Sequence, residues 1–172
     1  MTPSIQPSPL PADALLRKYQ QGIGYADCYV AEVPGKVSLA DFIEAFYTTR
    51  LFKIERTLLR WLAARPATDA DARALAAGGV DTFSAWRVED RSAYQLLLAD
   101  LLGKRTRSWL MAQPVNGAAR PATRLHFGSA VVPLVKRKTG EQRMGWGFHA
   151  LGGFHRLYSR LLLRAACRRL VG

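Results

Sequence analysis

The first half of the chain combines one strand pattern with several helix patterns. Residues 25–33, YADCYVAEV, alternate in side-chain character and end at a Pro-Gly turn, which predicts a strand. The SLAD motif at Ser38 resembles a capping box, and apolar residues follow it at helical spacing. The same spacing predicts a second helix at about 51–64 and, after the TDAD motif at Thr68, a short third one.

From residue 82 the pattern becomes extended. Four stretches have the length and residue types of strands, with short turn-like segments between them: 82–89, 94–101, 105–113 and 123–135. Short connections favour an antiparallel meander, because a parallel pair needs a long crossover connection. Residues 136–147 are expected to form a basic loop that contains glycine.

A long amphipathic helix is predicted at the C-terminal end, from about Phe148. Its expected buried face carries Phe154, Leu157, Tyr158, Leu161, Leu162 and Ala165. Arginines recur at every fourth position on another face, namely Arg156, Arg160, Arg164 and Arg168. A helix of about 20 residues is about 30 Å long, which is enough to cross one face of a sheet.

These elements together predict an α+β fold, in which the C-terminal helix covers one face of a curved antiparallel sheet. The small helices after the first strand would close one end, and an apolar cavity is expected between the sheet and the final helix. We predict a single domain over residues 25–172. Residues 1–24 begin with a proline-rich stretch and are expected to be a flexible leader with a short helical turn.

Composition indicates a folded protein with an uneven charge. The chain has 172 residues, of which 49% are hydrophobic and 22% charged; this excludes wholesale disorder and is the size of one domain. The formal net charge is +12, and all of the excess lies in residues 87–172. Such asymmetry is typical of proteins that meet an acidic partner or an anionic membrane, and a plain solvated face is the alternative.

Cysteine use and the N-terminal sequence predict a cytoplasmic protein. Cys28 and Cys167 are far apart in the sequence and make no disulfide framework. Residues 1–12 lack both the positive start and the continuous apolar stretch of a secretory signal. No uncharged apolar stretch reaches the length of about 18 residues that a spanning helix needs.

The sequence lacks the familiar motifs of metal, phosphate and nucleophile chemistry. The three histidines do not have the spacing of a metal site, and there is no Cys-x-x-Cys, glycine-rich phosphate loop or G-x-S-x-G motif. We therefore predict neither a metal nor a cofactor, and no residue is assigned a catalytic role. His155 is expected to cap the final helix or to pack beneath it.

Aromatic and polar residues on the predicted strands are the candidates for a ligand cavity. They are Trp86, Tyr94, Arg107, Trp109 and His126. Aromatic walls with a few polar groups are the usual lining of a small-molecule site. Arg107 would offer a planar fork for a carboxylate or phosphate group. The alternative is that the two tryptophans are plain core residues and that Arg107 faces solvent.

Several blocks of the sequence are similar to those of a known family: FKIERTLLRWLAARP at 52–66, GKRTRSWLMAQP at 103–114, TRLHFGSAVVP at 123–133 and FHRLYSRLLLRAA at 154–166. They resemble a bacterial family within the START and birch-pollen-allergen superfamily (SRPBCC). The resemblance covers about residues 25–170. It implies a helix-grip fold with an internal apolar cavity, which usually binds a ligand and is sometimes catalytic. It implies no particular reaction, and no catalytic residue is carried over.

Three functions are open at this point. The first is a binding domain that holds an apolar or amphipathic small molecule between the sheet and the final helix. The second is an enzyme of the cyclase or dehydratase type in the same cavity, with His126, Tyr94 or Asp100 as acid or base. The third is association of the basic half with an anionic membrane or with nucleic acid. Nucleic acid is the less favoured, because no RNP-like motif or helix-turn-helix is evident.

Overall fold

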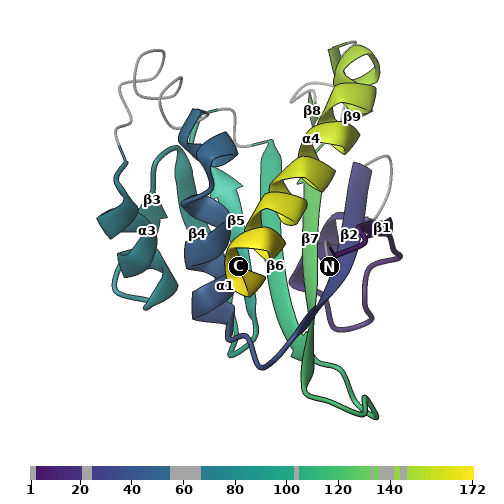
Figure 1. The fold of residues 1–172 in the computed structure, drawn as a ribbon. Coiled ribbons are helices and arrows are strands. Elements are labelled where there is room, and N and C mark those ends of the chain that lie inside the picture. Colours follow the sequence, from purple (N-terminus) through teal and green to yellow (C-terminus); the bar gives the residue numbers. More distant parts are fainter. Residues whose placement is uncertain are drawn as a thin grey trace.

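The computed structural model describes residues 3–20, 25–54, 67–102, 105–132, 134–135, 142–143 and 147–172. This part of the chain has an α+β fold, in which helices pack on one face of a curved, open sheet (Figure 1). The sheet has seven strands in the order β1-β2-β7-β6-β5-β4-β3, and every neighbouring pair is antiparallel.

The predicted meander is confirmed. Its strands are β3 (Thr82–Phe83), β4 (Trp86–Arg91), β5 (Gln95–Asp100), β6 (Thr106–Pro114) and β7 (Ala122–Val131). The first long strand, β2 (Tyr25–Pro34), pairs with β7 over its whole length, so the beginning and the end of the sheet region lie side by side. A separate two-stranded sheet is formed by β8 (Leu134–Val135) and β9 (Gln142–Arg143).

Two predicted strands have different bounds in the structure. The stretch 82–89 is divided into β3 and β4 by a tight turn, in which Ser84 has a left-handed φ of 53°. The stretch 123–135 leaves the large sheet at Val131, and residues 134–135 pair with β9 instead. Most of the predicted loop at 136–147 lies outside the described residues.

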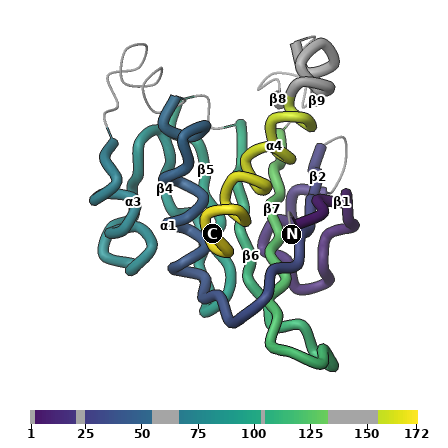
Figure 2. The backbone as a smooth tube through the Cα atoms, in the orientation of Figure 1, coloured from purple at the N-terminus to yellow at the C-terminus, as the bar shows by residue number. Residues whose placement is uncertain are grey.

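The helices begin where their capping signals predict. Both α1 (Leu39–Tyr47) and α3 (Asp69–Ala76) start with a complete capping box, formed by Ser38 with Asp41 and by Thr68 with Asp71 respectively. Residues 50–54 are helical, and the remainder of the predicted 51–64 helix lies outside the described residues. The C-terminal helix α4 (Gly147–Val171) packs against α1, β2 and β7, and Figure 2 shows it beside α1 in front of the strands.

The buried face of α4 differs from the predicted one. Leu157 and Leu161 are 57% and 43% exposed, whereas the residues that face the sheet and α1 include Ser159, Leu162, Leu163, Ala166 and Cys167. The predicted face is therefore corrected: it is displaced around the helix. Hydrophobic residues occur on both sides of this helix, so their spacing alone could not select the face that packs.

The N-terminal segment is not the flexible leader that its prolines predicted. In the structure, β1 (Gln6–Pro7) pairs with β2, and the short 3-10 helix η1 (Leu15–Tyr19) packs on the face of the sheet opposite α4. A second core forms there, from Leu10, Ala14, Leu16, Cys28, Leu97, Trp109, Met111 and Ala130. This segment covers apolar side chains that the sheet would otherwise expose, so it belongs to the same folded unit as residues 25–172.

Candidate functional site

A pocket of about 230 Å³ lies between the sheet and the helical layer. Its apolar wall is largely aromatic and includes Phe46, Phe52, Trp86, Phe127, Tyr158 and Leu162. Its polar groups include Thr106, Ser108, Ser129, His155 and Ser159. Small-molecule sites usually have this mixture but start at about 300 Å³, so the pocket suits a ligand smaller than a typical drug.

The alternation of strands and the turn of a helix explain why these residues meet. On each strand, alternate side chains point to the helical side, which is how Ser108 on β6 and Phe127 on β7 reach the pocket. His155, Ser159 and Leu162 follow one another at helical spacing on the sheet-facing side of α4. The site therefore depends on the rotation of α4 that the structure shows.

One side of the pocket holds a cluster of three polar residues, which we call the Asp27–Ser129–His155 cluster. Nε2 of His155 lies 2.6 Å from Oγ of Ser129, which in turn lies 2.7 Å from Oδ1 of Asp27. Asp27 and Ser129 are directly opposite each other on β2 and β7. Nε2 of His155 is also 3.7 Å from Oδ2 of Asp27. The cluster thus joins α4 to the neighbouring strands β2 and β7.

The Asp27 carboxylate is held by several donors. Its Oδ1 accepts hydrogen bonds from both the backbone N–H and the hydroxyl of Ser129, and its Oδ2 accepts from the Tyr25 hydroxyl at 3.2 Å. Burial and the neighbouring Asp27 raise the pKa of Tyr25 to about 12, so this tyrosine stays protonated and acts as a donor. Asp27 is therefore placed as a fixed acceptor behind Ser129 and His155.

Sequence reasoning missed this cluster. Asp27 shares a strand face with Tyr29, Ala31 and Val33, which are all buried. An acidic residue on an otherwise apolar face was the available signal, because a buried carboxylate needs partners. Its partners Ser129 and His155 are more than a hundred residues away. The pairing of β2 with β7 brings Ser129 to it, and the packing of α4 on these strands brings His155.

Two polar atoms in residues of the pocket wall are buried without a hydrogen-bond partner among the described residues. They are Nε1 of Trp86 and Oγ of Ser159. Of the predicted cavity residues, Trp86 is the one whose side chain packs against the apolar core on the helical side. Unsatisfied buried polar groups destabilise a fold, so both weaken the packing of this wall.

The other predicted cavity residues lie elsewhere, which corrects the expected lining. Trp109 and His126 are buried on the opposite face of the sheet, beneath the N-terminal segment. Trp109 is a core residue whose indole N–H donates to Gln95 Oε1 at 2.8 Å. Tyr94 is 39% exposed, and its hydroxyl donates to Asp13. Cross-strand neighbours decide which face of a strand meets which layer, and one strand's pattern does not show them.

Arg107 lines the pocket, but its side chain turns to the opposite face. Its guanidinium contacts Glu89 at 2.5 Å and the Tyr19 hydroxyl at 3.0 Å, and it lies 4.8 Å from the Tyr19 ring centre. Glu89 also accepts from Tyr19 and forms an ion pair with Lys18 at 2.8 Å. The predicted role of Arg107 as a fork for a ligand is thus replaced by a structural one, since it fastens η1 to the sheet.

The Glu89 network, which joins Glu89 to Lys18, Tyr19 and Arg107, predicts a dependence of stability on pH. Burial alone would raise the pKa of Glu89, but hydrogen bonds from Lys18 and Tyr19 and the charge of Arg107 outweigh it, so the pKa is lowered from 4.5. A lowered folded-state pKa means that the stabilisation is present above the unfolded-state pKa and is lost as pH falls through the folded-state value. We expect Glu89→Gln to lower the free energy of unfolding by about 1–3 kcal/mol at neutral pH.

Urea unfolding of wild type and Glu89→Gln tests this expectation. Both proteins are measured at neutral pH and again at an acidic pH well below the ordinary pKa of glutamate. The difference between the two proteins should shrink at the acidic pH. Glu32→Gln is the matched control, because Glu32 and Arg124 form an ion pair in which both side chains are about half exposed. An equal loss in both variants would contradict the structural role of the Glu89 network.

The remaining titratable candidates do not form an active centre. Burial lowers the pKa of His126 to about 4 and raises those of Cys28 and Cys167 to about 12, so all three are neutral at physiological pH. Asp100 accepts hydrogen bonds from Arg105 and Thr106 at the β5–β6 connection. Neither His126, Tyr94 nor Asp100 lines the pocket, so these predicted acid–base candidates are corrected.

A larger hollow, of about 750 Å³, lies beneath the N-terminal segment on the opposite face. It is an open groove whose wall includes Ser4, Gln6, His126 and the Glu32–Arg124 ion pair. That pair neutralises itself, and His126 is only 4% exposed, with its Nε2 atom buried. The smaller pocket beside α4 combines an aromatic wall with a reachable titratable residue, so we take it as the candidate site.

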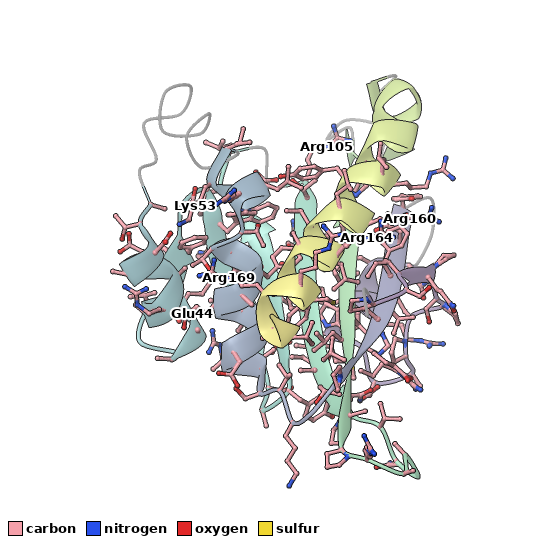
Figure 3. The ribbon with its side chains drawn as sticks, viewed as in Figure 1. Glu44, Lys53, Arg105, Arg160, Arg164 and Arg169 are labelled. Atoms are coloured by element: carbon pink, nitrogen blue, oxygen red, sulfur yellow. The ribbon has the colours of Figure 1, made fainter. Side chains whose placement is uncertain are left out.

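The outer side of α4 carries the predicted arginine stripe. Arg156, Arg160, Arg164 and Arg168 are all exposed, and Figure 3 shows Arg160 and Arg164 on this side. Arg160 lies over the Tyr29 ring, 5.4 Å from its centre. Exposed Leu157 and Leu161 lie between the arginines, and the sequence of α4 contains no acidic residue. This surface, which we call the basic-apolar face, is therefore both cationic and partly hydrophobic.

Within the described ranges, no three side chains of the His, Cys, Asp and Glu types lie close enough to share a metal ion. None of the described helices has the length and apolarity to cross a membrane.

Comparison of the chain with models of protein families, with curated proteins and with solved structures found no match.

Proposed function

We propose that this protein is a helix-grip binding domain that holds a small apolar or amphipathic molecule between the sheet and α4. The observation that carries the proposal is the aromatic pocket of about 230 Å³ at that place. The order of the elements supports it, because an antiparallel sheet with a long C-terminal helix across one face is the arrangement of the helix-grip superfamily that the sequence resembles.

The packing around the pocket also supports this proposal. Protein interiors are filled nearly as densely as organic crystals, and voids larger than a water molecule are few. Next to the pocket the core is tightly packed, with Phe46 in contact with the rings of Phe42, Tyr47, Phe52 and Phe127. An aromatic hollow beside so dense a cluster is suited to receiving an apolar group from outside.

Native mass spectrometry of the purified protein and thermal-shift measurements with a panel of small hydrophobes and acyl lipids test the proposal. Ser159→Leu should fill the pocket from α4 and weaken binding by about tenfold, or about 1.4 kcal/mol. Ser4→Leu is the matched control, because Ser4 is exposed and lines only the groove on the other face. If no ligand is found, or if Ser4→Leu weakens binding and Ser159→Leu does not, the assignment of this pocket fails.

A second candidate function is contact between the basic-apolar face of α4 and an anionic membrane. The favouring observation is that Leu157 and Leu161 are exposed between the arginines, because a purely solvated basic face would not need them. Near an anionic surface each arginine contributes about 1 kcal/mol, and the two leucines would add apolar contact.

Sedimentation with vesicles of phosphatidylcholine and phosphatidylserine should detect this contact at low salt. The bound fraction should fall at high salt, because the attraction is electrostatic. The double substitution Arg160→Glu and Arg164→Glu should abolish binding, whereas Arg73→Glu and Arg120→Glu, which change the charge by the same amount elsewhere, should reduce it less. Equal loss in both double variants would show that only the net charge matters. Binding to single-stranded DNA but not to vesicles would favour nucleic acid.

A further inference from the structure

His155 lines the pocket with one of its ring nitrogens already engaged. Its Nε2 is held by the Ser129 hydroxyl at 2.6 Å and faces Asp27 Oδ2 at 3.7 Å. No hydrogen bond from a described residue engages the other nitrogen, Nδ1, and the side chain is 35% exposed. A molecule in the pocket can therefore reach His155, and Nδ1 is the atom that remains for it.

The partners of the Asp27–Ser129–His155 cluster determine where its protons lie. A carboxylate can only accept, so the Ser129 hydroxyl donates its proton to Asp27 Oδ1, at 2.7 Å. The Ser129 oxygen then accepts from His155, so Nε2 carries a proton. In the neutral imidazole this leaves a lone pair on Nδ1. Ser129 itself is not placed as a nucleophile, because its proton points away from the histidine.

The same arrangement places a carboxylate behind His155. The imidazolium would face the Asp27 carboxylate, whose side chain is only 11% exposed, both directly and through Ser129. A carboxylate behind a histidine, on the side away from the reacting partner, is the arrangement that supports a general base. Other titratable or charged groups near the cluster include Tyr25, which donates to Asp27, and Arg156 on the outer side of α4. Cys28 and Tyr29 lie beside Asp27, whose charge adds to the effect of burial in raising their pKa values, and Tyr158 lies in the pocket wall.

We infer that the pocket takes a ligand with a weakly acidic hydroxyl, of the phenol or enol class, on a small apolar body, and that Nδ1 of His155 accepts its proton. The O–H bond breaks, a new N–H bond forms on His155, and the electron pair stays on the oxygen as a phenolate or enolate. No oxidant or other co-reactant is needed. The aromatic wall would hold the body, and a volume of about 230 Å³ limits it to a small ring system. This inference depends on the proposed function of the pocket.

The experiment compares two probes of nearly the same shape, 4-nitrophenol and its methyl ether 4-nitroanisole. Only the first has a proton to give, and the absorbance of its phenolate reports the transfer. With wild-type protein, at a pH where free nitrophenol is mostly protonated, we expect added protein to raise the phenolate absorbance. Nitrophenol should also bind about tenfold more tightly than nitroanisole, a difference of about 1.4 kcal/mol.

Substitutions separate the roles of the three residues. His155→Gln should bind the two probes with equal affinity and give no phenolate signal. Asp27→Asn should lower the phenolate fraction and leave the binding of nitroanisole unchanged, because Asp27 does not line the pocket and acts by positioning Ser129 and His155. Ser129→Ala should also lower the phenolate fraction, because it removes the acceptor that holds Nε2 of His155. His126→Gln is the matched control, since His126 lies on the other face of the sheet, and it should leave both measurements unchanged.

Each outcome decides one of the two proposals. If neither probe binds, the proposed binding function of this pocket and the inference both fail. If both bind equally to wild type without phenolate, or if His155→Gln keeps the signal, the inference is overturned and the binding function remains. Should the variants fail to fold, nitrogen-15 NMR of the wild-type histidines provides the test: nitrophenol must shift the His155 ring nitrogens toward the protonated form, and no shift overturns the inference.

Discussion

Replacing Gly128 with alanine should lower the free energy of unfolding by about 3 kcal/mol, the upper end of the usual range for overpacking. A Cβ atom at this position would lie 2.8 Å from the backbone oxygen of Asp27, 2.8 Å from Leu16 and 2.9 Å from Trp109. Leu16 and Trp109 are fully buried and cannot move into solvent. One of the three contacts is backbone, so relief would require β2 and β7 to separate.

Urea unfolding of Gly128→Ala tests this expectation, with Gly79→Ala as the matched control. At Gly79 the nearest atom to an added Cβ is a backbone oxygen at 3.6 Å, which is an ordinary contact. We expect Gly79→Ala to change stability by no more than about 0.5 kcal/mol. If the two variants were equally stable, η1 could not pack on β7 as described. The same shift of β2 would also move Asp27, so Gly128→Ala should disturb the pocket on the other face.

The second large effect is expected on α4. Leu163 is fully buried against the sheet and α1, so Leu163→Ala should lower the free energy of unfolding by about 2–5 kcal/mol. Leu161, two positions earlier on the same helix, is 43% exposed, and Leu161→Ala should change stability by no more than about 0.5 kcal/mol. The two variants remove the same atoms from the same helix, so their difference measures burial alone. Chemical unfolding followed by circular dichroism is the measurement.

This pair also tests the rotation of α4. The amphipathic pattern of the sequence had placed Leu161 on the buried face, together with Leu157. If Leu161→Ala were the more damaging variant, the helix would pack as the pattern predicted, and His155 would turn away from Ser129. The candidate site would then lose its titratable residue.

Local chemistry made much of the fold predictable. The capping boxes at Ser38 and Thr68 form within four residues of chain, so the starts of α1 and α3 could be identified from sequence. The short connections between the strands after residue 82 implied the meander, because a tight turn joins only antiparallel neighbours. Even the single strand predicted at 82–89 was wrong only in missing the sharp turn at Ser84.

Which side chains of each strand point to the helical layer, and which point to the opposite face, could not be predicted in the same way. On β6, Trp109 and Leu110 are both fully buried, although they point to opposite faces. A strand that is covered on both faces gives no contrast between buried and exposed positions, so Trp109 and His126 could not be assigned to one side. The proline-rich start of the chain likewise did not indicate that this segment covers one face of the sheet, because proline occurs in edge strands as well as in flexible leaders.

The amino-acid order alone therefore accounts for which segments are helices and strands, where the helices begin, and how charge is distributed along the chain. The first two properties depend on interactions between residues a few positions apart, and the charge distribution depends on no interaction at all. The pairing of β2 with β7, the rotation of α4 and the meeting of Asp27, Ser129 and His155 depend on contacts between residues about a hundred positions apart. Many arrangements satisfy the local preferences equally well, and only the packing of the whole molecule selects the one that forms this site.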